Sequence, residues 1–388
     1  MTDAVIVDAV RTASGKGKPG GQLSGFHPAA LLSDVLSALV DRTGIDPALI
    51  DDVIGGCVGQ AGEQAVNITR SAVLGAGLPE HIPATTIDRQ CGSSQQAAHF
   101  AAQGVLAGAY DVAIACGVEL MSKVPIGTAP MGQDPFGPAV AARYPEGLVN
   151  QGVSAELIAA RWKLDRAALD EYSARSHARA AATIAAGGFD NEIVPIGSVA
   201  QDETVRPSTT AEGLSALKPS FRDERLSARF PEIDWKITPG NSSPLTDGAS
   251  AVLIMSEDKA NSLGLRPKAR FHTFAVTGSD PLFMLTGVLP ATRKALDRSG
   301  LAIDAIDAYE VNEAFAPVPL VWQQEFGADP DRLNPRGGAI ALGHALGASG
   351  TRLLTTLLNH LEATGGRYGL QTMCEGGGMA NATIIERL

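Results

Sequence analysis

This 388-residue chain carries one pattern of short segments twice, at a shift of 256 residues that later slips to 258. The matching positions are 41–44 with 297–300, Asp51 with Asp307, 91–94 with 347–350, and then Gly108, Tyr110 and Cys116 with Gly366, Tyr368 and Cys374. Self-similarity of this kind indicates a duplicated supersecondary unit. We therefore predict two similar halves that face each other across a pseudo-twofold axis, with Cys91 and His344 at related turns.

Composition sets outer limits on the class of protein. The length predicts two or three domains, and 43 glycines and 23 prolines spread along the chain indicate turns between many short elements. A net charge of −11 argues against nucleic-acid binding as the main role. The beginning of the sequence is typical of a strand rather than a signal peptide, and no apolar run approaches 18 residues. We expect a cytoplasmic protein that does not bind a membrane.

The four cysteines form no CxxC pair and no other metal-ligand spacing. Neither a metal site nor a disulfide framework is therefore predicted. The role of each cysteine has to be judged from its own surroundings.

Strands and helices alternate in both halves, which predicts an α/β fold. The expected strands are 4–10, 52–58, 84–88, 111–118, 268–276, 307–312, 368–374 and 380–387. The expected helices are 28–42, 64–76, 92–107, 286–299, 315–326 and 349–362. Residues 119–266 differ in character and include a long Ala-rich helix over 165–186. We predict an N-terminal half over 1–118, a loop (cap) domain over 119–266 whose last strand returns to the N-terminal half, and a C-terminal half over 267–388.

Cys91 is the first candidate for catalysis. It follows a strand-like segment and precedes a helix, so its thiol would lie at a helix N-terminus, where the positive end of the dipole favours the thiolate. A thiolate is the form that attacks carbonyl carbon. The alternative is a small buried residue, the usual fate of a free cysteine.

His344 lies in a glycine-rich segment, residues 337–350, where backbones approach closely and few side chains compete for space. That setting suits a general base. The alternative is a turn histidine that binds a backbone carbonyl.

Two further segments end apolar strands with polar groups. In residues 373–380 Cys374 precedes three glycines, whose N–H groups could bind an oxyanion, and a second thiol beside a base suggests an acid/base pair. In residues 311–316 Asn312 could fix a water or an imidazole, and for Glu313 we favour capping of the next helix.

Together these motifs resemble those of the thiolases over essentially the whole chain. They are a Cys-x-Ser motif at Cys91, NEAFA at 312–316, GGAIALGH with GASG at 337–350, and CEGGG at 374–378. The resemblance implies a five-layered αβαβα thiolase fold, with duplicated βαβαβαββ halves and an inserted loop domain. It also implies a homodimer or homotetramer.

The resemblance further implies an acyltransferase mechanism through an acyl-cysteine. His344 would take the proton of Cys91, whose thiolate attacks a 3-oxoacyl-CoA, and Cys374 would protonate the leaving enolate. One oxyanion site would consist of His344 and a water on Asn312, the other of the N–H groups of Cys91 and Gly376. The products would be acetyl-CoA, or a similar short acyl-CoA, and a shortened acyl-CoA. No cofactor would be bound permanently, with coenzyme A acting as co-substrate.

For coenzyme A itself, the stretch 202–206 and the segments 217–219 and 240–243 resemble the CoA-binding region of thiolases. Arg206 would lie near the nucleotide and Ser243 near the pantetheine arm. A single arginine is more often a surface ion-pair partner.

Four positions depart from the family pattern. Ala345 replaces a common proline and could loosen the His344 turn, while Ser94 replaces a glycine beside the nucleophile. Asn150 and Gln151 stand where acetoacetyl-CoA thiolases typically have His-Met. These variants resemble degradative thiolases acting on longer or bulkier acyl chains, in fatty-acid breakdown or in breakdown of steroid side chains or rings.

Three alternatives remain at this stage. One is an acetyl-CoA acetyltransferase that forms acetoacetyl-CoA by Claisen condensation. Another is a condensing enzyme that takes its acyl group from a carrier protein. The last is a thiolase-like protein that binds acyl-CoA without turnover, against which the joint presence of Cys91, His344, Cys374 and Asn312 argues.

Overall fold

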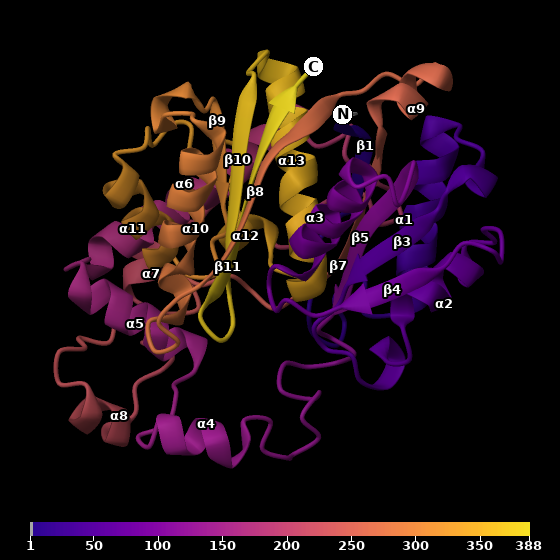
Figure 1. Cartoon of the computed structure of the whole chain (residues 1–388). Helices are drawn as coiled ribbons and strands as arrows, with labels where there is room; N and C mark the ends of the chain where they lie inside the picture. Colours follow the sequence, from indigo (N-terminus) through magenta and orange to yellow (C-terminus); the bar gives the residue numbers. More distant parts are fainter. Residues whose placement is uncertain (1–2) are drawn as a thin grey trace.

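A computed structural model describes residues 3–388 (Figure 1). One continuous sheet runs through the molecule in the strand order β4-β3-β5-β7-β1-β8-β11-β10-β9. The strands are β1 (Ala4–Thr12), β3 (Asp52–Gly56), β4 (Ala84–Ile87), β5 (Val112–Leu120), β7 (Thr246–Ser256), β8 (Ala269–Gly278), β9 (Ala308–Val311), β10 (Tyr368–Glu375) and β11 (Met379–Arg387). Two short strands, β2 (Gly15–Lys16) and β6 (Ile193–Val194), pair with β7 and β1.

The pairing pattern repeats, as the sequence predicts. In the first half β3 is parallel to β4 and β5, while β7 is antiparallel to β5 and β1. In the second half β9 is parallel to β10, while β11 is antiparallel to β10 and β8. The counterpart of β4 is reduced to a parallel bridge between Tyr309 and Leu333. The halves join where Val5 and Ile6 of β1 pair with β8.

Helices complete five layers. The outer helices α1 (Pro28–Thr43) and α2 (Ile68–Gly75) pack with the first half of the sheet in one apolar core, and α10 (Val288–Ser299) and α11 (Pro317–Phe326) pack with the second half in another. Between the halves, α3 (Ser93–Leu106) and α13 (Ser349–Thr364) pack against each other in a third core. Figure 1 shows this central pair between the two parts of the sheet. The predicted αβαβα arrangement is thus confirmed.

The segment between β5 and β7 carries most of the remaining helices. They are α4 (Gly137–Arg143), α5 (Gln151–Arg161), α6 (Arg166–Ala185), α7 (Ala211–Ser215) and α8 (Glu224–Arg229), while α9 (Glu257–Ser262) and α12 (Ala339–Leu342) lie further along the chain. α6 agrees with the predicted long helix: the Asp165 side chain accepts from Ala168 N at 2.8 Å, and Gly187 follows with a φ of 68°. The domain boundaries at 118/119 and 266/267 stay a prediction.

Most predicted elements agree with the structure to within about two residues, but the helix expected over 64–76 is wrong at its beginning. Val66 and Asn67 have left-handed φ values of 57° and 54°, which no helix accommodates. The Asn67 side chain then accepts from Arg70 N, so α2 begins at Ile68. The apolar periodicity predicted the helix, whereas the asparagine cap determined where it starts.

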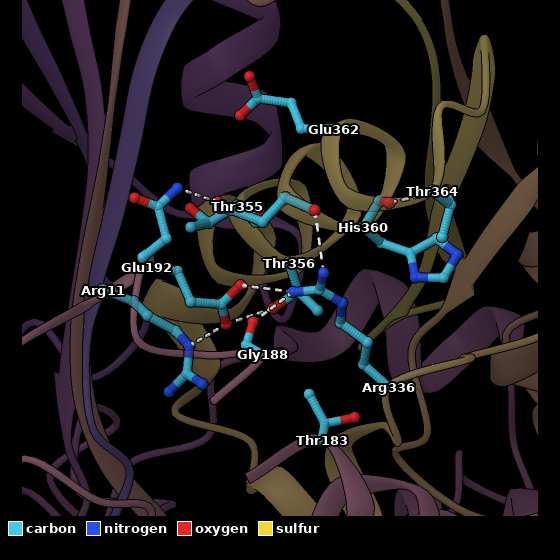
Figure 2. Close-up of polar contacts among 12 residues, drawn as sticks. Arg11, Thr183, Gly188, Glu192, Arg336, Thr355, Thr356, His360, Glu362 and Thr364 are labelled. Atoms are coloured by element: carbon cyan, nitrogen blue, oxygen red, sulfur yellow. Dashed lines mark hydrogen bonds and ion pairs between the residues drawn. The ribbon is translucent and has the colours of Figure 1, made fainter. Parts of the chain in front are cut away.

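Glu192 fixes the segment after α6 to the central helix α13. Its Oε1 accepts from Arg11 Nε at 2.6 Å and from Thr356 Oγ1 at 3.0 Å (Figure 2). Arg336 lies 3.9 Å from the other oxygen and donates to Gly188 O at 2.6 Å. Because these charged groups are buried, each depends on its partners, and removal of one would leave the others uncompensated. The network therefore holds the inserted segment against the sheet.

Candidate active site

Cys91 lies in the turn between β4 and α3, where the chain changes from strand to helix. Gln90 before it has a φ of 50°, and Gly92 after it is the N-cap of α3 without a side-chain cap. A Cβ atom on Gly92 would overlap the Glu375 carboxyl, so a side chain there would have to displace that carboxyl. The thiol itself is 3% exposed. The sequence correctly places this cysteine at a helix N-terminus.

Opposing effects act on the Cys91 thiol. Burial and then the neighbouring Glu375 carboxyl raise its pKa to about 12, while the Gln151 side chain and the N–H groups of Cys91 and Gly376 lower it. These three groups therefore lie near the sulfur and favour its thiolate form. The predicted pair of backbone donors, Cys91 and Gly376, is brought together, and Gln151 adds a donor from the beginning of α5.

Cys374 lies near the end of β10 and is fully buried. Burial, then Cys91, then Glu375 raise its pKa well above the ordinary thiol value. The influence of Cys91 shows that the two cysteines converge, although 283 positions separate them in the sequence. A thiol that holds its proton so strongly beside a nucleophile suits a proton donor and acceptor.

His344 lies against Asn312 and Ser349. Its Nε2 is 3.3 Å from Asn312 Nδ2, and its Nδ1 is 2.6 Å from Ser349 Oγ. Ser349 already donates its hydroxyl hydrogen to Ala345 O at 2.8 Å, so it accepts from Nδ1–H. Nε2 therefore carries a lone pair, and the imidazole has the tautomer that a base requires.

The imidazole is also held neutral. Burial, and then the charge of Arg352, lowers the pKa of His344 to about 3. Its backbone N–H donates to Thr246 Oγ1 at 2.9 Å, which fixes the turn to β7. Asn312 follows β9 and donates its N–H to Thr372 O at 3.0 Å, and its Oδ1 is buried without a partner within residues 3–388. A free acceptor thus lies beside the base.

Cys91 and Cys374 lie near His344 and Asn312 without a direct hydrogen bond to them in the described chain. Cys91 packs with Leu346, which is two residues after His344, and with Leu353 and Met373. No hydrogen bond joins the Cys91 thiol to His344 in the described part of the chain. A substrate carbonyl placed between the groups would be needed to engage both.

The two residues predicted for coenzyme A lie in different places. Ser243 is half-buried beside the NEAFA segment, with its N–H and Oγ both donating to Ala314 O at 3.0 and 3.2 Å. Arg206 is exposed and contacts His177, its guanidinium 3.3 Å from Nε2. Only Ser243 therefore adjoins the catalytic cluster.

Glu313 requires a correction, because it does not cap the next helix. α11 begins at Pro317 with no side-chain cap, and proline has no N–H to satisfy there. Glu313 is instead buried and accepts from four groups, which are Tyr172 Oη, Ser176 Oγ, Asn334 Nδ2 and Ile340 N. This carboxyl ties α6 to the segment that leads into His344.

The family departures are accommodated structurally. Ala345 has a φ of −72°, within the range proline adopts, and its carbonyl accepts from Ser349 Oγ and Ala348 N. The turn is therefore held without proline. Ser94 is buried, and its hydroxyl accepts from Thr351 N at 3.0 Å, so this departure links α3 to α13.

Sequence reasoning missed three side chains that shape the site. Gln151 was noticed only as a family variant, and Ser349 only as part of GASG. Glu119 accepts from Gly347 N at 2.9 Å and from Val58 N and Gly59 N, so it anchors the turn after His344. A polar residue within an apolar strand is the signal that could have revealed Glu119.

No group of three or more potential metal ligands occurs in the part of the chain that the structure describes. Among the helices within residues 3–388, none is long and apolar enough to cross a membrane.

Comparison with known families agrees with this geometry. The thiolase N-terminal domain matches residues 4–258, and the thiolase C-terminal domain matches residues 265–387. The chain therefore belongs to the thiolase family, as its motifs predicted.

Individual relatives extend this result. A steroid 3-ketoacyl-CoA thiolase, FadA6 of Mycobacterium tuberculosis, is 50% identical, with 100% of this chain and 95% of the relative covered. A 3-ketoacyl-CoA thiolase of Serratia proteamaculans is 42% identical, with 100% of both covered. The crystal structure of the Bacillus anthracis acetyl-CoA acetyltransferase superposes with a TM-score of 0.89 at 35% identity, covering 100% of this chain and 99% of that one.

Proposed function

We propose that this protein is a 3-ketoacyl-CoA thiolase, an acetyl-CoA C-acyltransferase that cleaves a 3-oxoacyl-CoA with coenzyme A. The observation that carries the proposal is the convergence of Cys91 and Cys374 beside a neutral His344 held by Asn312. The names of the relatives, a steroid and several 3-ketoacyl-CoA thiolases, support a degradative role.

In the first step His344 Nε2 takes the proton of the Cys91 thiol. The thiolate then attacks the 3-keto carbon, and the carbonyl oxygen becomes an oxyanion. Because the pKa of the free thiol is high, this proton moves only when substrate and base are in place. The oxyanion would be stabilised by His344 and a water on Asn312, or by the N–H groups of Cys91 and Gly376.

In the second step the bond between C2 and C3 breaks. The electron pair leaves as the enolate of acetyl-CoA, which takes a proton from Cys374. Coenzyme A then enters, gives its thiol proton to Cys374, and attacks the acyl-Cys91 carbonyl. The shortened acyl-CoA leaves as the Cys91 thiolate recovers the proton held by His344, so every proton is accounted for. No permanently bound cofactor is needed, since coenzyme A is the co-substrate.

We propose that Ser243 lies along the pantetheine arm and that Arg206 binds nearer the nucleotide. The position of Ser243 beside Ala314 supports the first assignment. Arg206 is exposed, as a contact to a phosphate-bearing ligand would require.

The preferred acyl chain is proposed to be longer or bulkier than four carbons. Gln151, rather than methionine, contacts the nucleophile, and the relative with a steroid substrate is 50% identical. The second candidate is acetoacetyl-CoA chemistry, which the fold likeness to an acetyl-CoA acetyltransferase favours.

The experiment is CoA-dependent cleavage of 3-oxoacyl-CoA substrates from four carbons to long-chain and ring-bearing acyl groups. Wild type is compared with Cys91→Ala and with Cys116→Ala, which removes a buried thiol of β5 outside the site. Loss of cleavage in the first variant alone supports the proposal. Cleavage that survives in Cys91→Ala would refute it, and a profile that peaks at four carbons would favour the second candidate.

We further propose a cytoplasmic homodimer or homotetramer. Light scattering of the purified protein distinguishes these two assemblies, and a monomer would contradict both.

A further inference from the structure

Glu375 is a buried carboxyl that the thiolase reaction leaves without a task. It is the last residue of β10 and lies between Cys374, whose pKa Cys91 raises, and Gly376, whose N–H lowers the pKa of Cys91. Its side chain is fully buried, and neither carboxyl oxygen has a hydrogen-bond partner within residues 3–388. An ionised carboxylate without partners is costly to bury, so such a group requires an explanation.

The carboxyl of Glu375 lies against the turn that carries Cys91. Its oxygen lies where a Cβ atom of Gly92 would be, directly beside the nucleophile turn. Both Cys91 and Cys374 are subject to its charge. If all three groups ionised, the Glu375 carboxylate would therefore lie near two thiolates and repel both.

Other charged groups act on Glu375 only from the strand-to-helix loop. Arg89 favours its ionised form and Asp88 opposes it. The Arg89 guanidinium lies 3.8 Å from Met379 Sδ, and no ion pair joins it to Glu375 in the described chain. With these opposite charges nearby, burial dominates and raises the pKa of Glu375 to about 9.

The Glu375 carboxyl and the Cys91 thiol are both negative when ionised, and their repulsion is strong in a site without water. The group that ionises first therefore raises the pKa of the other. If Glu375 is neutral, the Cys91 proton moves to His344 without electrostatic repulsion between Glu375 and the thiolate that forms. If Glu375 is ionised, thiolate formation is opposed.

We propose that Glu375 is a positioning residue that remains protonated in the active enzyme, fills the space beside Gly92, and hinders formation of the Cys91 thiolate once it ionises at alkaline pH. This inference rests on the proposed role of Cys91 as nucleophile. It concerns ionisation of a thiol and not turnover, so it can be tested without substrate.

The test is the rate at which iodoacetamide alkylates Cys91, measured by peptide mass spectrometry, as a function of pH. The thiolate attacks the methylene carbon and iodide leaves, so the rate follows the thiolate population. We expect Glu375→Gln and wild type to react equally at about pH 7, where Glu375 is neutral, and Glu375→Gln to be faster by about threefold or more near pH 10.

Glu310→Gln is the matched control, since Glu310 is also buried with a pKa raised to about 8 by burial, but lies beside Arg352 rather than Cys91. Its alkylation profile should follow that of wild type. A rate ratio of one at every pH would show that Glu375 does not act on the thiol. A constant ratio above one would show that Glu375 is already ionised at neutral pH. Either result overturns the proposal.

Two measurements keep the proposal testable if Glu375→Gln does not fold. Arg89→Met removes the cation that favours the ionised carboxyl, so the pH at which the rise of the alkylation rate becomes less steep should move upward; a move to lower pH would contradict the proposal. The infrared spectrum of Glu310→Gln, which lacks the other buried carboxyl of raised pKa, should lose a protonated carboxyl band at the same transition when it is titrated from about pH 7 to 10. Thiolysis lost in Cys91→Ala with no such transition would retain the proposed function and reject this inference alone.

Discussion

Gln151 and Ser349 act on the two reacting groups from opposite sides. Ser349 sets the tautomer of His344 by accepting from Nδ1, because its own hydrogen is used on Ala345 O. Gln151 donates toward the sulfur of Cys91. Neither side chain carries out chemistry by itself, but one prepares the base and the other favours the thiolate.

Replacement of Gln151 by methionine, the residue expected in acetoacetyl-CoA thiolases, should therefore slow acylation. A hydrogen bond to a charged group is worth about 1.5–3 kcal/mol, which corresponds to a loss of about 10- to 100-fold in kcat/KM. Gln103→Met, on the exposed face of α3, is the control and should be neutral. Equal kcat/KM values in the two variants would show that Gln151 does not assist the nucleophile.

At the scale of elements, the His344 turn is held by polar contacts at a position where the family pattern predicts proline. Ala345 has a φ of −72°, its N–H makes no hydrogen bond within residues 3–388, and His344 before it forms a β-bridge with Leu245. An extended residue followed by this φ value is the geometry that proline accepts.

Ala345→Pro should consequently stabilise the protein by about 0.4–1 kcal/mol, because it restricts the unfolded chain. Ala345→Gly is the matched opposite and should destabilise it by a similar amount. Urea unfolding of the three proteins under identical conditions gives the comparison. A destabilised proline variant would show that the turn needs freedom that its backbone angles do not reveal.

Element by element, the sequence predicts what depends on local pattern. Apolar periodicity was enough for strands such as β10 and for helices such as α6, and the duplication predicted the shared pairing order. Local pattern does not predict the role of a side chain whose partners lie in a distant segment of the chain. Local pattern predicts that Glu313 caps the helix that follows it, yet its partners come from α6, from α12 and from Asn334 in the loop before α12.

The residues of the candidate site also fall into those that local pattern reveals and those that it does not. Cys91, His344, Cys374 and Asn312 could be found because glycine-rich turns and strand ends mark them in the sequence. Gln151 and Glu119 could not be assigned a role, since Gln151 reaches Cys91 from the inserted segment and Glu119 reaches Gly347 from β5. Only the folded chain shows which distant residues lie beside the reacting groups.

At the scale of the whole molecule, the site depends on both halves. The N-terminal half supplies Cys91 at the beginning of α3, and the C-terminal half supplies the base, the second thiol and Asn312. The packing of α3 against α13 brings these turns together, and Ser94 with Thr351 fixes their relative position. In the proposed mechanism the duplication has a function, because each half contributes a different group at a related turn.

Buried ionisable groups should also set the pH dependence of the stability of the whole fold. Burial lowers the pKa of His99 and His344 to about 3, and of His177 and His360 to about 4. The unfolded chain protonates these groups near their ordinary value of 6.5, whereas the native protein does not. Their contribution is therefore present above about pH 6.5 and is lost as the pH falls toward 4.

Glu310 and Glu375 act in the opposite direction, since burial raises their pKa values to about 8 and about 9 from 4.5. Their contribution is present below about pH 4.5 and is lost as the pH rises toward 9. Between about pH 4.5 and 6.5 four histidines outweigh these two carboxyls, and above that range the carboxyls lower stability, joined near pH 9 by the buried cysteines, whose pKa values burial also raises, so the free energy of unfolding should peak between about pH 6 and 7. Urea unfolding from about pH 5 to 9 tests this expectation. In the plot of the free energy of unfolding against pH, Glu310→Gln should reduce the slope on the alkaline side and His360→Gln the slope on the acid side. A free energy of unfolding that rises steadily to pH 9 would show that the buried carboxyls do not destabilise the protein at alkaline pH.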